Sequence, residues 1–202
     1  MKQRILMMLL SIAASMSYGQ ERDVVQLSVL GGFTPYESSF GIGGAASYSR
    51  LLSDHVEIFG TAQWFNGTYT TELPAYSYDN TERVLVLDLG FQANLTPESE
   101  SNRLLVGIGG SIVGVTYEYG EFVFPERVEM NTVEERIPMF LLRLENRYFI
   151  SQWLFASAQL SARTSFSEQA VVERSISPSG NVGVTGGVRY TVNLSVGLGY
   201  LF

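Results

Sequence analysis

Side chains in the last part of the chain alternate between apolar and small or polar at almost every step. From Val182 to Phe202 the apolar residues share one parity, and Gly, Ser, Thr and Asn occupy most of the other. Period two places the two kinds of side chain on opposite faces of a β-strand. The pattern predicts a strand over 182–202, longer than the strands that soluble sheets usually contain.

The same alternation recurs along the chain and predicts eight strands in all. They span approximately 24–33, 41–51, 55–65, 83–95, 103–117, 136–149, 153–166 and 182–202. The clearest is 83–95, where odd positions from Leu85 to Leu95 are apolar and even positions include Asp88, Gln92 and Asn94. Every strand therefore has one apolar face, and we expect an all-β fold.

The first residues indicate export. Lys2 and Arg4 precede the apolar run 5–10, and small residues, Ser17 and Gly19, follow at the spacing of a signal-peptide cleavage site. We therefore expect a signal peptide over 1–19 and one mature domain over 20–202. The chain has no cysteine for a disulfide or a lipid anchor. No later apolar run approaches the roughly 18 residues of a membrane helix, so a membrane-bound mature chain has to be a closed barrel.

Alternation alone does not separate a membrane barrel from a soluble lipocalin-like barrel, whose apolar face points inward. The non-apolar faces here carry mainly Gly, Ser, Thr, Gln and Asn rather than the Lys and Glu of a water-exposed surface. The connections also alternate, long at 66–82, 118–135 and 167–181 and short at 52–54, 96–102 and 150–152. These features predict an eight-stranded antiparallel transmembrane β-barrel with both termini on the short-turn, periplasmic side.

The predicted long loops are acidic. The acidic residues are Glu72, Asp79 and Glu82 in one loop and Glu118, Glu121, Glu126, Glu129, Glu134 and Glu135 in another. The full chain has a formal charge of −7, and losing the two cations of the signal peptide leaves −9. Nucleic-acid binding, which needs a basic patch, is not expected. The acidic loops either attract divalent cations or basic partners or are simply a solvated rim.

A few charges fall on the face predicted to line the barrel interior. They are Glu57, Asp88, Arg143, Glu145, Arg147 and Arg163. Counting from the short turns, Glu57 lies at the depth of Arg147 and Asp88 at the depth of Arg143, which predicts these ion pairs. Since side chains nearly fill an eight-stranded barrel, we expect a structural plug; the alternative is a gated polar pathway.

Catalysis is not expected. A Ser/His/acid triad would have to use His55, the only histidine. This residue follows the short turn 52–54, on the rim opposite the long loops. The sequence has no calcium-loop motif and no cysteine, and its Gly-Ile-Gly-Gly repeats lie within predicted strands. We expect no metal and no cofactor.

These features together resemble the small outer-membrane β-barrels of Gram-negative bacteria, of the OmpX and OmpA membrane-domain type. Ser195, Gly197, Tyr200 and Phe202 match the carboxy-terminal assembly motif of that family. The resemblance implies recognition of the last strand by the outer-membrane insertion machinery and a setting of outer-membrane lipid and lipopolysaccharide. It implies no reaction, and because no domain follows the motif, peptidoglycan binding does not carry over.

Two functions from different classes follow. The first is a structural or surface-interaction, adhesin-like barrel whose loops 66–82 and 118–135 contact an extracellular protein. In this reading the fifth and sixth strands can project beyond the membrane, because Tyr117, Tyr119 and Val123 continue the alternation. The second is a small channel or carrier for small or apolar solutes, similar to OmpW-type barrels. The inward Leu105, Val113 and Val115 permit a small apolar patch in the lumen. A ten-strand count is open if a long loop contains a hairpin.

Overall fold

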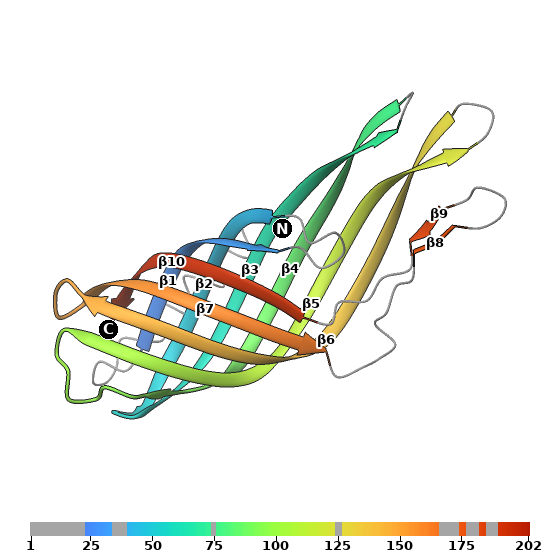
Figure 1. The fold of residues 1–202 in the computed structure, drawn as a ribbon. Coiled ribbons are helices and arrows are strands. Elements are labelled where there is room, and N and C mark those ends of the chain that lie inside the picture. The colour runs from blue at the N-terminus through green and yellow to red at the C-terminus, as the bar shows by residue number, and fades with distance from the viewer. Residues whose placement is uncertain are drawn as a thin grey trace, which may run out of the picture.

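The computed structural model describes residues 23–33, 40–73, 76–123, 127–165, 174–176, 182–184 and 190–202 (Figure 1). The strands are β1 (Asp23–Phe33), β2 (Phe40–Ser53), β3 (Val56–Leu73), β4 (Tyr76–Asn94), β5 (Asn102–Val123), β6 (Arg127–Phe149), β7 (Leu154–Ser165), β8 (Arg174–Ile176), β9 (Val182–Val184) and β10 (Tyr190–Leu201). The predicted signal peptide lies outside the described residues. Among those residues, no helix combines the length and apolar character needed to cross a membrane.

Eight of the strands close into one antiparallel barrel, as predicted. The order around it is β1-β10-β7-β6-β5-β4-β3-β2. Barrel strands that are consecutive in the chain are therefore paired, and the first barrel strand also pairs with the last. The β1–β10 ladder closes the ring and runs from Val24↔Leu201 to Gly32↔Asn193. Closure leaves every barrel strand paired on both sides within the common belt, which removes the sheet edges.

The last predicted strand is too long. Val182–Val184 forms β9, which pairs with β8 in a separate two-stranded sheet, and the closing barrel strand begins at Tyr190. Alternation shows that a segment is extended but not which strand it pairs with, and the apolar parity already skips Gly186. The loop after β7 therefore does contain a hairpin, but the barrel keeps eight strands.

The segments predicted as long loops 66–82 and 118–135 are mostly strand. β3 and β4 stay paired as far as Leu73↔Tyr76, and β5 and β6 as far as Val123↔Arg127. Their neighbours leave earlier: β2 pairs with β3 only up to Asn66, and β7 pairs with β6 only up to Met139. Two ribbons, β3–β4 and β5–β6, therefore project from one rim of the barrel (Figure 1). The outward face of a projecting ribbon meets water, so polar residues there do not imply a loop; on the inward face of β4, Asn80 and Glu82 are buried.

The apolar faces of the barrel strands point outward. Large apolar side chains such as Leu27 and Leu89, each 65% exposed, cover the outer surface, while Gln, Ser, Thr and charged residues are buried inside. Exposed aromatic residues border this belt: Phe33, Phe40, Trp64 and Tyr190 near the ribbons and Tyr148, Trp153 and Tyr200 near the short turns. An apolar belt between aromatic girdles is the surface of a transmembrane barrel and excludes the lipocalin-like alternative.

Candidate functional site

The interior charges come from four strands and meet in the middle of the barrel. All six predicted residues are at most 5% exposed: Glu57 on β3, Asp88 on β4, Arg143, Glu145 and Arg147 on β6, and Arg163 on β7. They contribute three carboxylates and three guanidinium groups, so the formal charges cancel. In a narrow interior, charges this deeply buried are tolerated only when they are paired and hydrogen-bonded.

One group of ion pairs is organised by β6. Residues 143, 145 and 147 share a face because strand side chains repeat every second residue. Glu145 accepts a hydrogen bond from Arg143 Nη2 at 2.7 Å and another from Arg147 Nε at 2.9 Å. Arg147 Nη1 reaches Glu57 Oε1 on β3 at 2.9 Å. Gln92 and Ser49 also donate to Glu57 Oε2, at 2.7 Å and 2.9 Å.

The second group joins β7 to β4. Arg163 binds Asp88 with two hydrogen bonds, Nε to Oδ1 at 2.9 Å and Nη2 to Oδ2 at 2.6 Å. Ser111 Oγ and Gln63 Nε2 also donate hydrogen bonds to this carboxylate, at 2.6 Å to Oδ1 and 3.0 Å to Oδ2. The predicted Asp88–Arg143 pair is wrong: Arg143 binds Glu145 and donates to Thr61 Oγ1 at 3.0 Å. The prediction failed because depth counted from the short turns does not say which way around the barrel a side chain points. It also overlooked Glu145, which lies two residues from Arg143 on the same strand.

Apolar side chains close the interior on both sides of these charges. Toward the short turns, Val24, Phe155 and Leu201 form a buried cluster with Leu51 and Phe149 packed against it. The guanidinium of Arg147 lies 5.2 Å from the Phe155 ring centre, so the charged and apolar layers are in contact. Toward the ribbons, a larger buried cluster comprises Leu30, Ala45, Phe65, Val84, Val86, Val113, Val115, Ile137 and Met139. The interior is thus a charged layer between two apolar layers.

The apolar layer nearest the ribbons was predicted in part and the one nearest the short turns was missed. Leu105, Val113 and Val115 were predicted to face inward and all three are buried, but Phe155 was assigned only to the non-apolar face. Strand parity places Phe59, Phe65 and Phe155 on the inward face. Parity was therefore the signal that could have found both layers.

Residues of the predicted assembly motif lie along the closing strand. Ser195 faces the interior and Tyr200 faces outward, where its ring stacks on Trp153 at 6.5 Å and on Phe202 at 6.1 Å. Phe202 exchanges two backbone hydrogen bonds with Asp23, of 2.9 Å and 3.0 Å. A Cβ on Gly197 would overlap Ser28 and the Leu27 carbonyl of β1. The β1–β10 seam therefore requires glycine at this position.

His55 lies where the sequence placed it, in the turn between β2 and β3 on the rim that carries both barrel termini. It is exposed, and its backbone N–H donates to Ser53 Oγ at 3.3 Å. Within the described ranges, no three His, Cys, Asp or Glu residues come close enough to hold a metal ion.

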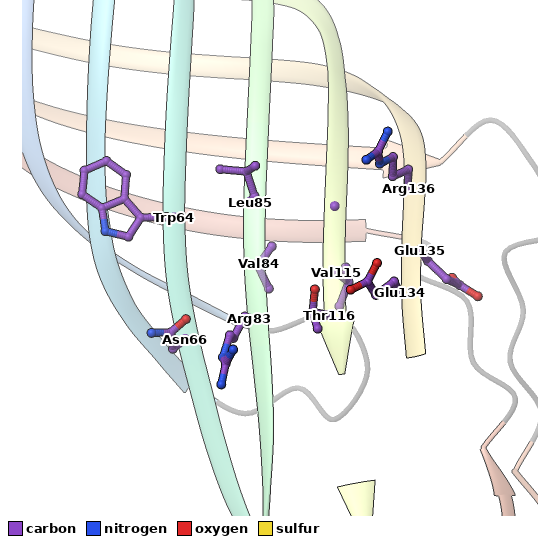
Figure 2. Close-up of a pocket in the computed structure, with 11 residues that line it drawn as sticks. Trp64, Asn66, Arg83, Val84, Leu85, Val115, Thr116, Glu134, Glu135 and Arg136 are labelled. Carbon is purple, nitrogen blue, oxygen red and sulfur yellow. The ribbon is translucent and has the colours of Figure 1, made fainter. Parts of the chain in front are cut away.

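A cavity of about 620 Å³ lies on the outer surface where the ribbons leave the barrel (Figure 2). Its outward side chains form two neighbouring rows across β3 to β6. The lower row is Trp64, Leu85, Gly114 and Arg136, and the upper row is Asn66, Arg83, Thr116 and Glu134. Arg83 also pairs with Glu118 at 3.3 Å. The rows mark the boundary between the apolar belt and the polar ribbons.

Comparison with known proteins places the fold. The chain is similar to OprG of Pseudomonas aeruginosa (TM-score 0.62, 11% identity, 91% of this chain and 98% of that chain). It is also similar to neisserial surface protein A (TM-score 0.57, 9% identity, 89% and 96%). Ail, the attachment invasion locus protein of Yersinia pestis, solved with the heparin analogue sucrose octasulfate, gives a TM-score of 0.55 at 8% identity over 91% and 100%. No family model and no curated protein sequence matches.

This chain has the fold of the small outer-membrane β-barrels. The sequence resemblance to that class is confirmed at the level of fold. The similar structures are small outer-membrane barrels that align with this chain over almost their whole length, and this chain forms a closed barrel of eight strands. At identities near 10% the likeness carries no residue roles from one protein to another.

Proposed function

We propose that the protein is an integral outer-membrane barrel that acts at the cell surface through its projecting ribbons. The observation that supports this is the layered interior, in which paired charges lie between two buried apolar layers. Such an interior serves as a structural plug, so function falls to the rims. The adhesin-like role is supported by the ribbons and, as analogy only, by the fold shared with Ail. No catalytic role is proposed.

The proposed orientation places both termini and the short turns in the periplasm and the ribbons outside the cell. Asp23, Phe202 and the three short turns share one rim, as in transmembrane barrels of this class. The acidic side chains near the opposite rim then favour a basic extracellular protein partner. Protease added to intact cells should cleave the ribbons and spare the short turns; the reverse pattern would invert the orientation.

Assembly is proposed to depend on recognition of the closing strand by the outer-membrane insertion machinery, through Ser195, Gly197, Tyr200 and Phe202. Replacing the exposed Tyr200 and Phe202 by Ser leaves the interior untouched. Slow membrane insertion in cells, with normal refolding in detergent, supports recognition. Equal defects in both settings would assign these residues to stability alone.

Ribbon shortening tests the surface role. Thr132 pairs with Glu118, so replacing residues 119–131 by Asn-Gly joins the two strands through a two-residue turn without changing the register. Thr68 pairs with Thr81, so replacing 69–80 makes the matched variant of the other ribbon. Loss of cell-surface binding with unchanged solute uptake supports the proposal. Unchanged binding in both variants contradicts it.

The second candidate is a carrier for small apolar solutes. The apolar layer nearest the ribbons favours it, since Phe65, Val113 and Met139 make that end of the interior hydrophobic. Beside this layer, β6 has no β7 partner beyond Met139. Planar-bilayer recording and uptake into vesicles separate the candidates: sustained large conductance excludes the plug, and uptake of apolar solutes without conductance supports the carrier.

A further inference from the structure

The exposed arginines of the outer surface lie in two places. Three of the arginines whose side chains the structure describes are exposed on the outward face: Arg50, Arg83 and Arg136. Arg50 lies near the short-turn rim beside Asp23. The other two both line the cavity of Figure 2, on β4 and β6, on either side of β5. We propose that this cavity binds the phosphorylated sugar headgroup of lipid A, the membrane anchor of lipopolysaccharide.

The cavity lies at the correct depth for such a headgroup. Its lower row contains Trp64 and Leu85, which continue the apolar belt, and its upper row is polar. Tryptophan is typical of the level at which acyl chains give way to headgroups. An acyl chain can lie along Leu85 and Ile112, while the phosphates reach Arg136 in the lower row and Arg83 in the upper row. This placement rests on the proposed outer-membrane orientation, which puts the ribbons outside the cell and the cavity at the level of the outer leaflet.

β5 leaves room for a ligand between the two arginines. Gly114 pairs with Leu85 on one side and Arg136 on the other, so β5 places no side chain between Leu85 and Arg136. A Cβ on Gly114 would meet only the Leu85 carbonyl oxygen at 3.6 Å, which is an ordinary contact. The neighbouring Thr116 is short. A sugar ring can therefore sit over β5, while Trp64 marks the β3 edge of the cavity with its indole directed toward Gly44 of β2 (Figure 2).

Guanidinium groups suit this ligand. Arginine binds phosphate oxygens with two parallel hydrogen bonds, which lysine does not. Arg83 is 60% exposed, and its 3.3 Å pair with the 35% exposed Glu118 is weak because both groups are solvated. A phosphate carries more charge than a carboxylate, so it can replace Glu118 as the partner of Arg83.

The carboxylates at the cavity distinguish two ways of binding a phosphate, because they weaken one and strengthen the other. Glu134 and Glu135 line it, and Glu118 lies next to it. If the phosphates bind the arginines directly, these carboxylates oppose binding. If a divalent cation bridges carboxylate and phosphate, they favour it. The two arginines that line the cavity favour direct binding.

The experiment measures lipid A binding to the refolded full-length mature protein in detergent micelles. Trp153→Phe leaves Trp64 as the only tryptophan, so its fluorescence reports the cavity. Diphosphoryl lipid A is the probe, with dephosphorylated lipid A and phosphatidylethanolamine as comparisons. The double variant Arg83→Gln/Arg136→Gln should bind diphosphoryl lipid A about tenfold or more weakly. Arg50→Gln is the matched control, because Arg50 is similarly exposed (58%) and also has a carboxylate partner, and it should bind normally.

Two further variants keep the proposal decidable if the arginine variant does not refold. Gly114→Leu fills the hollow and should abolish binding, whereas Gly110→Leu, on the same face of β5 outside the cavity, should not. Glu118→Gln/Glu134→Gln should tighten binding by a few-fold, and magnesium chelation should leave it unchanged.

Three results overturn the proposal: equal binding by the Arg83/Arg136 and Arg50 variants, equal binding of phosphorylated and dephosphorylated lipid A, and loss of binding on chelation together with weaker binding by the glutamate variant. Failure of the site is distinct from failure of the proposed location. A protein that fractionates with the outer membrane but does not bind lipid A overturns only the site.

Discussion

Breaking the Asp88–Arg163 pair should strongly destabilise the barrel. Asp88→Asn preserves the shape of the side chain but removes the charge that neutralises Arg163, which is 1% exposed and donates one hydrogen bond to each carboxylate oxygen. The amide of Asn keeps only one of these two acceptors. Removing one member of a buried pair costs about 3–5 kcal/mol, because the other charge remains buried and uncompensated. Arg143, Glu145 and Arg147 belong to the other group of ion pairs, so no other carboxylate is placed to take over.

The pair itself contributes much less than this penalty. Replacing both members with apolar residues, as in Asp88→Leu/Arg163→Met, removes the two charges together and is expected to recover most of the lost stability. The exposed pair provides the matched control: Glu118→Gln leaves Arg83 in water and should change the free energy of unfolding by at most about 1 kcal/mol.

Urea unfolding in detergent, followed by tryptophan fluorescence and by heat-modifiable migration in gels, measures these changes. The wild type, Asp88→Leu, Arg163→Met and the double variant Asp88→Leu/Arg163→Met form a double-mutant cycle, which measures the net contribution of the pair. Losses below about 1 kcal/mol for Asp88→Asn would refute the reasoning, because Arg163 would then have to be solvated by water inside the barrel. Such a result would also weaken the plug and favour a polar pathway.

Three other predictions follow from the geometry. Glu145→Gln should destabilise more than the aspartate substitution in the same urea assay, because this carboxylate binds two arginines; a smaller loss would mean that the β6 group is not the main support of the interior. Gly197→Ala should cost about 1–3 kcal/mol through the clash at the β1–β10 seam, and Gly110→Ala, where nothing lies within 4 Å of the added Cβ, should be nearly neutral. Ile108→Arg, in the outward belt, should cost about 2–4 kcal/mol in lipid vesicles, and Asn66→Arg at the belt edge about 1 kcal/mol or less; equal costs would mean that the belt does not face lipid.

The barrel was predictable because its strands carry a strict two-residue period. An apolar exterior has to be continuous, so the outward parity of β4 from Leu85 to Phe91 is fixed by the solvent it meets. That requirement ends where the ribbons leave the belt. Beyond Arg83 the outward positions of β4 are Thr81 and Asp79, and pairing continues although the apolar pattern does not. Strand ends on the ribbon side were therefore underestimated.

Pairing inside the barrel was predicted less well, because it depends on three-dimensional neighbours. Glu57 and Arg147 are 90 residues apart yet meet at 2.9 Å, and depth counting predicted them as partners. The same counting failed for Asp88. Its partner Arg163 lies across the interior on β7, and no one-dimensional count contains the direction in which a side chain crosses the barrel.

The layered interior also constrains any conducting state. In the proposed plug, moving Arg163 away from Asp88 opens no path by itself, because apolar clusters formed by side chains from several strands lie on both sides of the charges. Conduction would require the charged layer and both apolar layers to rearrange together, while the outer ladder keeps each strand in register. The outer cavity needs no such rearrangement, because its arginines are already exposed on the outward face at the edge of the apolar belt. The parts of this barrel that can meet a ligand without unfolding its interior are the ribbons and the belt edge beneath them.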